Sequence, residues 1–337
     1  MKTRLIYLLL FVIVSVSAQE VSVKKIWDNG KHNAFPSIIE FKGKYYCSFR
    51  EGETHIFNSK GDADGKVRII ASADGEKWES VALLSKSLYD LRDPKLSITP
   101  DGKLMVIIGG SIYKGQNLEG RIPQVSFSSD GLNFTEPEPA RIDKKVKSGM
   151  DWLWRVTWDG KTGYVVNYEL MDQDKARIAL LKTTNGLDYK MVTKIDIPDF
   201  PNETTVRILP DKEMLMMVRQ ERGDKMGLWG RSYPPYTKWT FTKMDMRLGG
   251  PDFIPLGDNL IVAGSRSHAV EDNPQTLIMT GDRSGHFISK YILPSGKDNS
   301  YPGFLIVGDE LWVCYYSSHE TDQACMYLAK IPLKSLR

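Results

Sequence analysis

Residues 72–78 read Ser-Ala-Asp-Gly-Glu-Lys-Trp, and the same pattern returns twice further along the chain. Residues 128–134 read Ser-Ser-Asp-Gly-Leu-Asn-Phe and residues 183–189 read Thr-Thr-Asn-Gly-Leu-Asp-Tyr, at intervals of 56 and 55 residues. In each copy Asp or Asn caps a tight turn, Gly takes the position with positive φ, and an aromatic ring packs beneath it. A turn that recurs at this period predicts a repeat architecture.

Six hairpin-like segments carry a similar period through the whole chain. Each has an apolar strand, a tight turn and a second apolar strand, with Val, Ile, Tyr and Trp in the strands, as is typical of a β-hairpin. The turns fall at Gly43, Gly102, Gly160, Lys212, Asp258 and Asp309, with intervals of 59, 58, 52, 46 and 51 residues. About 50 residues fit one four-stranded blade. The sequence therefore predicts an all-β, six-bladed β-propeller, with a β-sandwich as the alternative.

The three turn repeats resemble the Asp-box, Ser-x-Asp-x-Gly-x-x-Trp, of the sialidase superfamily, in a shortened form. Residues 231–239 resemble a fourth, degraded copy. In phase with the hairpins, the repeats cover nearly the whole mature chain. The resemblance implies a sialidase-like propeller, and Asp-boxes also occur in proteins that are not enzymes.

The N-terminal residues have the layout of a secretory signal peptide. Lys2 and Arg4 precede an apolar run from Leu5 to Val14, and small residues end at Ala18. The run is too short to span a bilayer, which disfavours the alternative of a membrane anchor. We expect residues 1–18 to be cleaved, residues 19–337 to form one propeller domain, and the protein to be secreted or periplasmic.

The overall charge gives no pull toward nucleic acid or anionic lipid. The chain has 45 basic and 42 acidic side chains, and removing Lys2 and Arg4 leaves 43 against 42. Three cysteines are too few for a disulfide framework. Cys314 and Cys325 could pair across neighbouring strands in an oxidising compartment, and buried free thiols are the alternative. No zinc-binding spacing is present, so we predict neither a metal nor a cofactor.

The geometry of a propeller predicts where a site would lie. Each innermost strand starts at the end of the channel at which the next strand finishes, so these residues ring one face. The starts are residues 33–35, 92–93, 151–152, 202–203, 251–252 and 300–301, and the finishes are 50–51, 109–110, 168–169, 219–221, 266–268 and 318–320. Most single charged residues are simply solvated. Arginines alternating with carboxylates around one pocket predict binding of a polyhydroxylated or anionic ligand.

The sialidase resemblance implies roles for four residues in this ring. In that family a Glu at a strand start activates a nucleophilic Tyr at the start of the last blade, and three arginines clamp the substrate carboxylate. Glu203 and Tyr301 hold the positions of that pair. Arg219, at the finish of the following strand, matches one arginine of the clamp, and Arg266 is the nearest candidate for another. A phenol is a poor nucleophile near its free pKa of about 10, so it needs an adjacent carboxylate.

The sequence departs from the family pattern at two places. The family's first arginine is missing, because Phe35-Pro36 stands where an Arg-Ile-Pro motif is expected. Arg50 or Arg92 is a spatial substitute. The acidic Asp of the family is also missing from the loop after the first hairpin, and His55 there is a candidate general acid or merely an exposed residue. Asp93, in Arg-Asp-Pro, is a further candidate carboxylate or the cap of a turn.

The predicted catalytic residues are therefore Glu203, Tyr301, Asp93 and His55. The predicted substrate-binding residues are Arg50, Arg92, Arg155, Arg219, Arg266, Glu169 and Asp252. Together they predict a secreted, exo-acting glycoside hydrolase whose partner is a glycan. The missing arginine leaves open whether the terminal sugar is sialic acid or another acidic sugar, such as a uronic or ulosonic acid. A polysaccharide lyase, with Tyr301 or His55 as base, and a non-catalytic glycan-binding propeller are the alternatives.

Overall fold

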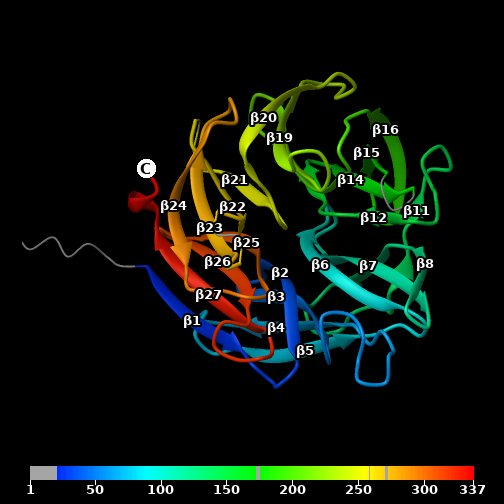
Figure 1. Ribbon diagram of the computed structural model, residues 1–337, viewed down its shortest axis with the longest axis vertical. Helices are drawn as coiled ribbons and strands as arrows, with labels where there is room; N and C mark the ends of the chain where they lie inside the picture. Colours follow the sequence, from blue (N-terminus) through cyan, green and yellow to red (C-terminus); the bar gives the residue numbers. More distant parts are fainter. Residues whose placement is uncertain (1–20, 172–174, 258, 270–271) are drawn as a thin grey trace, which may run out of the picture.

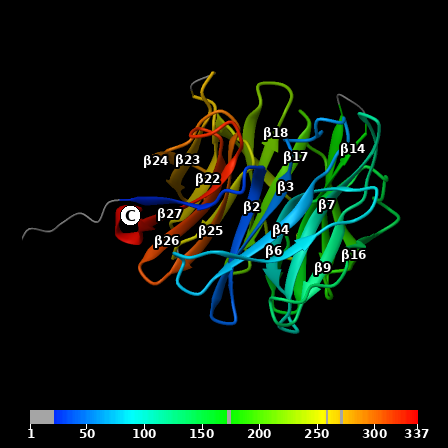
Figure 2. The same ribbon diagram turned by 90° about the horizontal axis from the view of Figure 1, so that it is seen from below.

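A computed structural model describes residues 21–171, 175–257, 259–269 and 272–337. These residues form six sheets arranged as blades around a common axis, which confirms the predicted six-bladed propeller (Figure 1). Turned by 90°, the blades stand side by side (Figure 2). The predicted signal peptide, residues 1–18, lies outside the described residues.

The first three blades follow one another along the chain. The first contains β2 (His32–Phe41), β3 (Lys44–Gly52), β4 (Lys66–Ser72) and β5 (Glu79–Leu84). The second contains β6 (Asp90–Ile98), β7 (Leu104–Lys114), β9 (Gln124–Ser128) and β10 (Glu138–Pro139), with β8 (Asn117–Arg121) beside β7. The third contains β12 (Asp151–Leu153), β13 (Thr157–Asp159), β14 (Thr162–Leu170), β15 (Ala176–Thr183), β16 (Asp188–Ile195) and β11 (Arg141–Ile142).

The last three blades include the closure of the ring. The fourth contains β17 (Pro201–Ile208), β18 (Met214–Gln220), β19 (Met226–Ser232) and β20 (Thr240–Arg247). The fifth contains β21 (Asp252–Pro255), β22 (Ile261–Ser267), β23 (Gln275–Gly281) and β24 (Phe287–Leu293). The sixth contains β25 (Asn299–Val307), β26 (Glu310–Ser317), β27 (Cys325–Pro332) and β1 (Ser22–Trp27), followed by the 3₁₀ turn η1 (Leu333–Ser335). The first strand of the chain thus completes its last blade (Figure 1).

The Asp-box turns lie where the repeat predicts them, between the third and fourth strands of the first three blades. In the first turn the Ser72 hydroxyl accepts from the Gly75 amide at 2.8 Å, and Asp74 caps the next two amides at 2.8 and 3.0 Å. The other two copies repeat these bonds. The degraded copy occupies the equivalent turn of the fourth blade, between β19 and β20.

The hydrophobic core lies mainly between neighbouring blades, because each sheet buries both faces against the next. One cluster joins the first and second blades through residues such as Tyr46 and Val106, and another joins the fifth and sixth through Ile278 and Tyr315. Within the described residues no helix is long and apolar enough to cross a membrane.

Of the two alternatives left open for Cys314 and Cys325, the structure contains free thiols and not a disulfide. The two cysteines lie on the neighbouring strands β26 and β27 but not opposite each other, because Cys325 lies opposite Ser317 and Cys314 lies opposite Leu328. All three cysteines are buried and free, which agrees with the alternative stated above. Cys314 instead contacts Cys47 of the first blade, with 3.0 Å between the sulfurs.

Candidate active site

The residues at the starts of four innermost strands lie in β-bulges. The pairing register shifts near the start of β2, β6, β17 and β25. The shifted segments hold Phe35, Asp93, Glu203 and Tyr301. Three of them have positive φ, at 64° for Phe35, 46° for Asp93 and 53° for Tyr301, and each of these three precedes a proline. A bulge redirects a side chain out of the ladder, and here it brings all four to one cavity.

That cavity has a volume of about 180 Å³ and lies at the mouth of the channel. Its walls come from the first, second, third, fourth and sixth blades. The lining residues are Phe35, His55, Ile56, Arg92, Asp93, Ser111, Tyr113, Arg121, Trp152, Tyr168, Glu203 and Tyr301. All four predicted catalytic residues therefore share one enclosure, together with one predicted substrate-binding residue, Arg92.

Glu203 and Tyr301 meet across the channel from the fourth and sixth blades. The Tyr301 hydroxyl donates to Glu203 Oε1 at 2.6 Å, so the carboxylate is adjacent to the phenol, as the sialidase resemblance implies. Arg219 touches both groups, with Nη1 lying 2.5 Å from Glu203 Oε2 and 3.0 Å from the Tyr301 oxygen. The Gly250 amide also donates to Glu203 Oε2, at 2.9 Å. The carboxylate is thus held on both oxygens.

The electrostatics of the pair keep the proton on the phenol. Burial alone would raise the pKa of Glu203, but the Arg219 charge and the hydrogen bonds from Tyr301, Arg219 and Gly250 outweigh it and lower that pKa. Burial and the nearby Glu203 charge raise the pKa of Tyr301, against the opposing influence of Arg219 and Arg266. The unliganded site therefore contains a carboxylate beside a neutral phenol.

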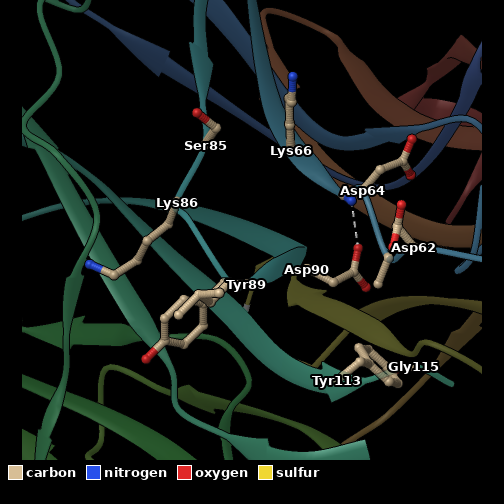
Figure 3. A pocket seen from close by; sticks show the side chains of 12 residues that line it. Asp62, Asp64, Lys66, Ser85, Lys86, Tyr89, Asp90, Tyr113 and Gly115 are labelled. Carbon is tan, nitrogen blue, oxygen red and sulfur yellow. Dashed lines mark hydrogen bonds between the residues drawn. The ribbon is translucent and has the colours of Figure 1, made fainter. Parts of the chain in front are cut away.

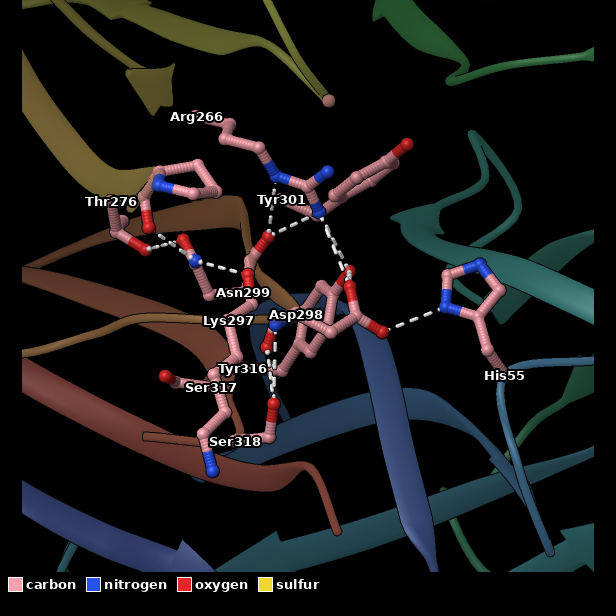
Figure 4. A network of polar contacts seen from close by, with 12 residues as sticks. His55, Arg266, Thr276, Lys297, Asp298, Asn299, Tyr301, Tyr316, Ser317 and Ser318 are labelled. Carbon is pink, nitrogen blue, oxygen red and sulfur yellow. Dashed lines mark hydrogen bonds and ion pairs between the residues drawn. The ribbon is translucent and has the colours of Figure 1, made fainter. Parts of the chain in front are cut away.

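Arg266 stabilises the bulge that carries Tyr301. Its guanidinium donates to the Asn299 carbonyl at 3.0 and 2.6 Å and lies 5.7 Å from the centre of the Tyr301 ring. It also contacts the Tyr316 hydroxyl at 3.0 Å (Figure 4). Arg266 does not line the cavity, so its polar atoms hold the protein backbone instead.

His55 reaches the cavity from the loop after β3, and Asp298 holds its ring. His55 Nδ1 lies 2.7 Å from Asp298 Oδ2, which leaves the other ring nitrogen pointing away from Asp298 (Figure 4). The same oxygen contacts His32 Nε2 at 2.9 Å, and Tyr316 donates to Asp298 Oδ1 at 2.7 Å. Burial would raise the pKa of Asp298, but the bonds from the two histidines lower it. Asp298 escaped sequence analysis because it precedes the strand start by a residue.

His32, His55 and Asp298 form a cluster that could hold a metal ion. One ligand atom each from His32, His55 and Asp298 lies within 4.8 Å of the others. Their closest separations, 2.7 and 2.9 Å, are those of direct hydrogen bonds. Arg266 also contacts Asp298, at 3.3 Å. A cationic neighbour and short hydrogen bonds favour a proton network over a metal site.

Asp93 lines the same cavity as the Glu203–Tyr301 pair. Its Oδ1 is buried and has no partner. Burial raises its pKa, and the positive charges of Lys95 and Arg92 oppose that effect. Lys95, itself fully buried, has its pKa lowered to about 8 by burial and by Arg155. A buried carboxyl oxygen without a partner at a cavity is suited to a ligand hydroxyl.

Two arginines present their charge to the cavity. Arg92 lies 5.2 Å from the Phe35 ring and contacts the His55 carbonyl at 3.2 Å. Arg121 lies 5.0 Å from the Trp152 ring, and its Nε is buried without a partner. Arg121 was not predicted from the sequence because it belongs to β8, a strand outside the hairpin repeat. The long interval between the second and third strands of this blade was the only sequence feature that indicated an extra strand.

Besides Arg219 and Arg266, four other predicted substrate-binding residues do not line the cavity. Arg50 is fully buried and binds Asp90 and two carbonyls of the loop that carries His55, so it supports that loop and does not replace the missing arginine. Arg155 and Asp252 form a buried ion pair at 3.2 Å. Glu169 pairs with Arg177 at 3.0 Å. These side chains are engaged with protein partners, whereas Phe35 lines the cavity.

Solved structures share this architecture. A protein of unknown function from Dyadobacter fermentans matches with a TM-score of 0.78 and 16% identity, over 93% of this chain and 100% of that one. The sialidase of Trypanosoma rangeli matches with a TM-score of 0.70 and 11% identity, over 95% of this chain and 60% of that one. The endosialidase of phage phi92 matches with a TM-score of 0.69 and 11% identity, over 93% and 69%.

Neither a family model nor a curated protein matches the sequence. The chain spans 60% of the length of the trypanosomal sialidase, and at such low identity the match concerns the fold alone. With six blades, Asp-box turns and this structural likeness, the chain has the six-bladed propeller fold of the sialidases.

Proposed function

We propose that this chain is an exo-acting glycoside hydrolase that releases a terminal acidic sugar from a glycan. The observation that carries the proposal is the 2.6 Å hydrogen bond between Tyr301 and Glu203, with Arg219 in contact with both oxygens. Sialidases use a tyrosine nucleophile where most glycosidases use a second carboxylate. The small cavity, about 180 Å³, fits the end of a glycan better than its middle.

In the first step the Tyr301 oxygen attacks the anomeric carbon while Glu203 Oε1 takes the phenolic proton. The bond to the leaving oxygen breaks, and His55 donates a proton to that oxygen through its free ring nitrogen. Water then attacks the anomeric carbon of the glycosyl-tyrosine with His55 as base. The proton on Glu203 returns to the departing phenolate of Tyr301. A neutral nucleophile avoids repulsion from an acidic sugar.

The charges around the cavity support an acidic substrate. Arg92 and Arg121 line it, and Arg219 adjoins it through the Glu203–Tyr301 pair. Arginine binds carboxylates with two parallel hydrogen bonds, so the buried Arg121 Nε without a partner is suited to this role. Asp93 would accept a hydroxyl of the same sugar.

The test is a glycan panel with product analysis, using wild type, Tyr301→Phe and Tyr315→Phe. The control is matched, because Tyr315 is also buried in the sixth blade and its hydroxyl donates one bond, to Pro294 at 2.9 Å. We expect Tyr301→Phe to lose turnover by several orders of magnitude and Tyr315→Phe to stay within a few-fold of wild type. Equal activity of the two variants would remove Tyr301 as nucleophile.

A covalent probe tests the same step directly. The Trypanosoma rangeli sialidase has been solved with sialic acid, and with 2,3-difluorosialic acid as a covalent intermediate. If sialic acid is the substrate here, this reagent should add one fluorosugar mass to Tyr301 in wild type and none in Tyr301→Phe. An ultraviolet-absorbing unsaturated uronate from the glycan panel would instead indicate a lyase, and binding without any product would indicate a glycan-binding propeller.

The proposed activity fits export from the cytoplasm. We propose that residues 1–18 are removed during secretion, so that the mature chain starts within a few residues of Gln19. Intact mass of the protein from culture medium or periplasm checks this, and a mass that includes Met1 in those fractions would contradict it.

A further inference from the structure

A second cavity adjoins the candidate active site between the first and second blades. Its volume is about 310 Å³, and its lining includes Asp62, Asp64, Lys66, Tyr89 and Tyr113 (Figure 3). Tyr113 lines both this cavity and the catalytic one, so the two meet at that side chain.

One loop serves both cavities. Residues 53–64 carry His55 to the catalytic cavity and Asp62 and Asp64 to the second one. The loop is closed on itself by a bridge between Phe57 and Ala63, and Phe57 packs edge-on against Tyr113 with 5.1 Å between ring centres. The loop that carries His55, the proposed acid, therefore also forms part of the lining of the second cavity.

Several hydrogen bonds hold Asp90, which lines the second cavity. The buried Asp90 accepts from the Gly65 amide at 2.7 Å and from Arg50 at 2.8 Å. Its other oxygen lies 3.3 Å from Arg92, which lines the catalytic cavity. A side chain at position 65 would collide with Asp90. Asp90 thus connects the lining of the second cavity to Arg92 in the lining of the catalytic cavity.

We propose that this second cavity binds the uncharged sugar unit to which the terminal sugar is attached, a neutral hexose or N-acetylhexosamine. The inference rests on the proposed function. A general acid must stand beside the glycosidic oxygen that it protonates, so the leaving sugar departs on the His55 side of the catalytic cavity. The second cavity lies next to that side, because the loop that carries His55 lines it and Tyr113 lines both cavities.

The chemistry of the lining fits such a sugar. The rings of Tyr89 and Tyr113 offer apolar surfaces, while carboxylates accept from hydroxyls and Lys66 donates to them. Both signs of charge are present, because the lining contains Asp62 and Asp64 together with Lys66 and Lys86, whose amine donates to the Pro137 carbonyl. A carboxylated sugar would meet repulsion from the two aspartates. The volume lies at the lower end of ligand pockets, about 300–1,000 Å³.

Binding can be measured without turnover. Saturation-transfer NMR with lactose, N-acetyllactosamine and chitobiose should show binding to wild type and to Tyr301→Phe. We expect Tyr89→Ala and Lys66→Ala to weaken it about tenfold. Tyr233→Ala, which removes an exposed tyrosine of the fourth blade, is the matched control and should bind like wild type. Absence of binding by all three disaccharides, equal binding by all variants, or tighter binding of digalacturonate would overturn the inference.

Activity measurements separate this inference from the proposed function. With 3′-sialyllactose, Tyr89→Ala should lower kcat/KM about tenfold, whereas with the methyl sialoside, whose leaving group is a single methoxy group and cannot fill the second cavity, the loss should be much smaller. Hydrolysis with equal losses on both substrates would overturn the subsite and keep the hydrolase. If wild type cleaves neither substrate, the hydrolase proposal loses its sialidase form, and the disaccharide titration still decides whether the cavity binds neutral sugar.

Discussion

At the scale of single residues, the chemistry of the site depends on whether the shared proton is on Tyr301 or on Glu203. Glu203 has a lowered pKa and Tyr301 a raised one, so both are in the states that a base and its nucleophile need before reaction. The Arg219 charge lowers the pKa of Glu203, whereas burial and the Glu203 charge raise the pKa of Tyr301, and Arg219 bonds to both groups. The three side chains therefore act as a unit, and their mutational effects should not add.

The first residue-scale prediction concerns Glu203→Gln. The amide cannot take the phenolic proton, so turnover should fall by about 10²–10⁴-fold. The double variant Glu203→Gln/Tyr301→Phe should be little worse than either single one, because each alone disables the same step. Single-turnover rates on the active glycan measure this. Losses that multiply in the double variant would show that the two residues act independently.

The second residue-scale prediction concerns Asp93 and pH. Its pKa in the folded protein is raised above the unfolded value, so the folded state loses stability as pH rises through that interval. Because pH 7 lies above the unfolded pKa of Asp93, this raised pKa costs stability there, and Asp93→Asn should raise the free energy of unfolding.

The gain from Asp93→Asn should shrink at acidic pH, where Asp93 is protonated and resembles Asn. Asn also tolerates the positive φ of 46° at this position. Urea unfolding at pH 7 and at pH 4 measures both values. A variant that is less stable than wild type at pH 7 would contradict the assignment of Asp93 as a strained, ligand-facing carboxyl.

At the scale of elements, the bulged strand starts make the site. Phe35, Asp93 and Tyr301 each stand before a proline, which has no amide hydrogen for the ladder. The shifted register frees these residues from pairing and turns them to the cavity. Backbone strain of this kind costs about 1–3 kcal/mol per residue and tends to occur at functional sites.

Ser300 offers a test of that strain. It has φ of 95°, and its hydroxyl is buried without a partner. Ser300→Gly should relieve both costs and stabilise the protein by about 1 kcal/mol, after about 0.5–1 kcal/mol is lost to the greater chain entropy of glycine.

The control for this prediction is Ser126→Gly. Ser126 is also buried, its φ is not positive, and its hydroxyl donates to Thr135 at 2.6 Å. Its replacement should destabilise the protein. Thermal unfolding compares the two, and a lower melting temperature for both variants would show that Ser300 is not strained.

Local patterns predicted these elements well and the closing strand not at all. The hairpins and Asp-box turns follow from Asp-Gly turns and alternating apolar residues, which are local signals. The strand starts predicted that Glu203 and Tyr301 lie on the same face, and the resemblance to the sialidases implied that they pair. By contrast β1 pairs with β27 from the opposite end of the chain, and Arg50 points into a loop of its own blade. Burial by distant partners decides such cases, and spacing alone does not show it.

At the scale of the whole molecule, the Asp-box turns join neighbouring blades. Each turn glycine packs on the second strand of the preceding blade around the ring. Gly131 lies against Tyr46, Gly186 against Met105, and Gly75 against Trp312 across the seam where the ring closes. The repeat is therefore a contact between blades as well as a turn within one.

Gly131→Ala and Gly102→Ala separate these two roles. Both glycines have positive φ, at 79° and 77°, so alanine strains each backbone by about 1 kcal/mol. A methyl group at position 102 meets nothing within 4 Å, whereas one at 131 collides with the buried Tyr46 ring. Gly131→Ala should therefore lose about 1–3 kcal/mol more than Gly102→Ala, the cost of overpacking. Urea unfolding of both variants measures the difference. Equal losses would mean that the turn serves only its own blade. Partial recovery of stability in Gly131→Ala/Tyr46→Phe, which removes the nearest oxygen and leaves the ring carbons in place, would confirm the contact.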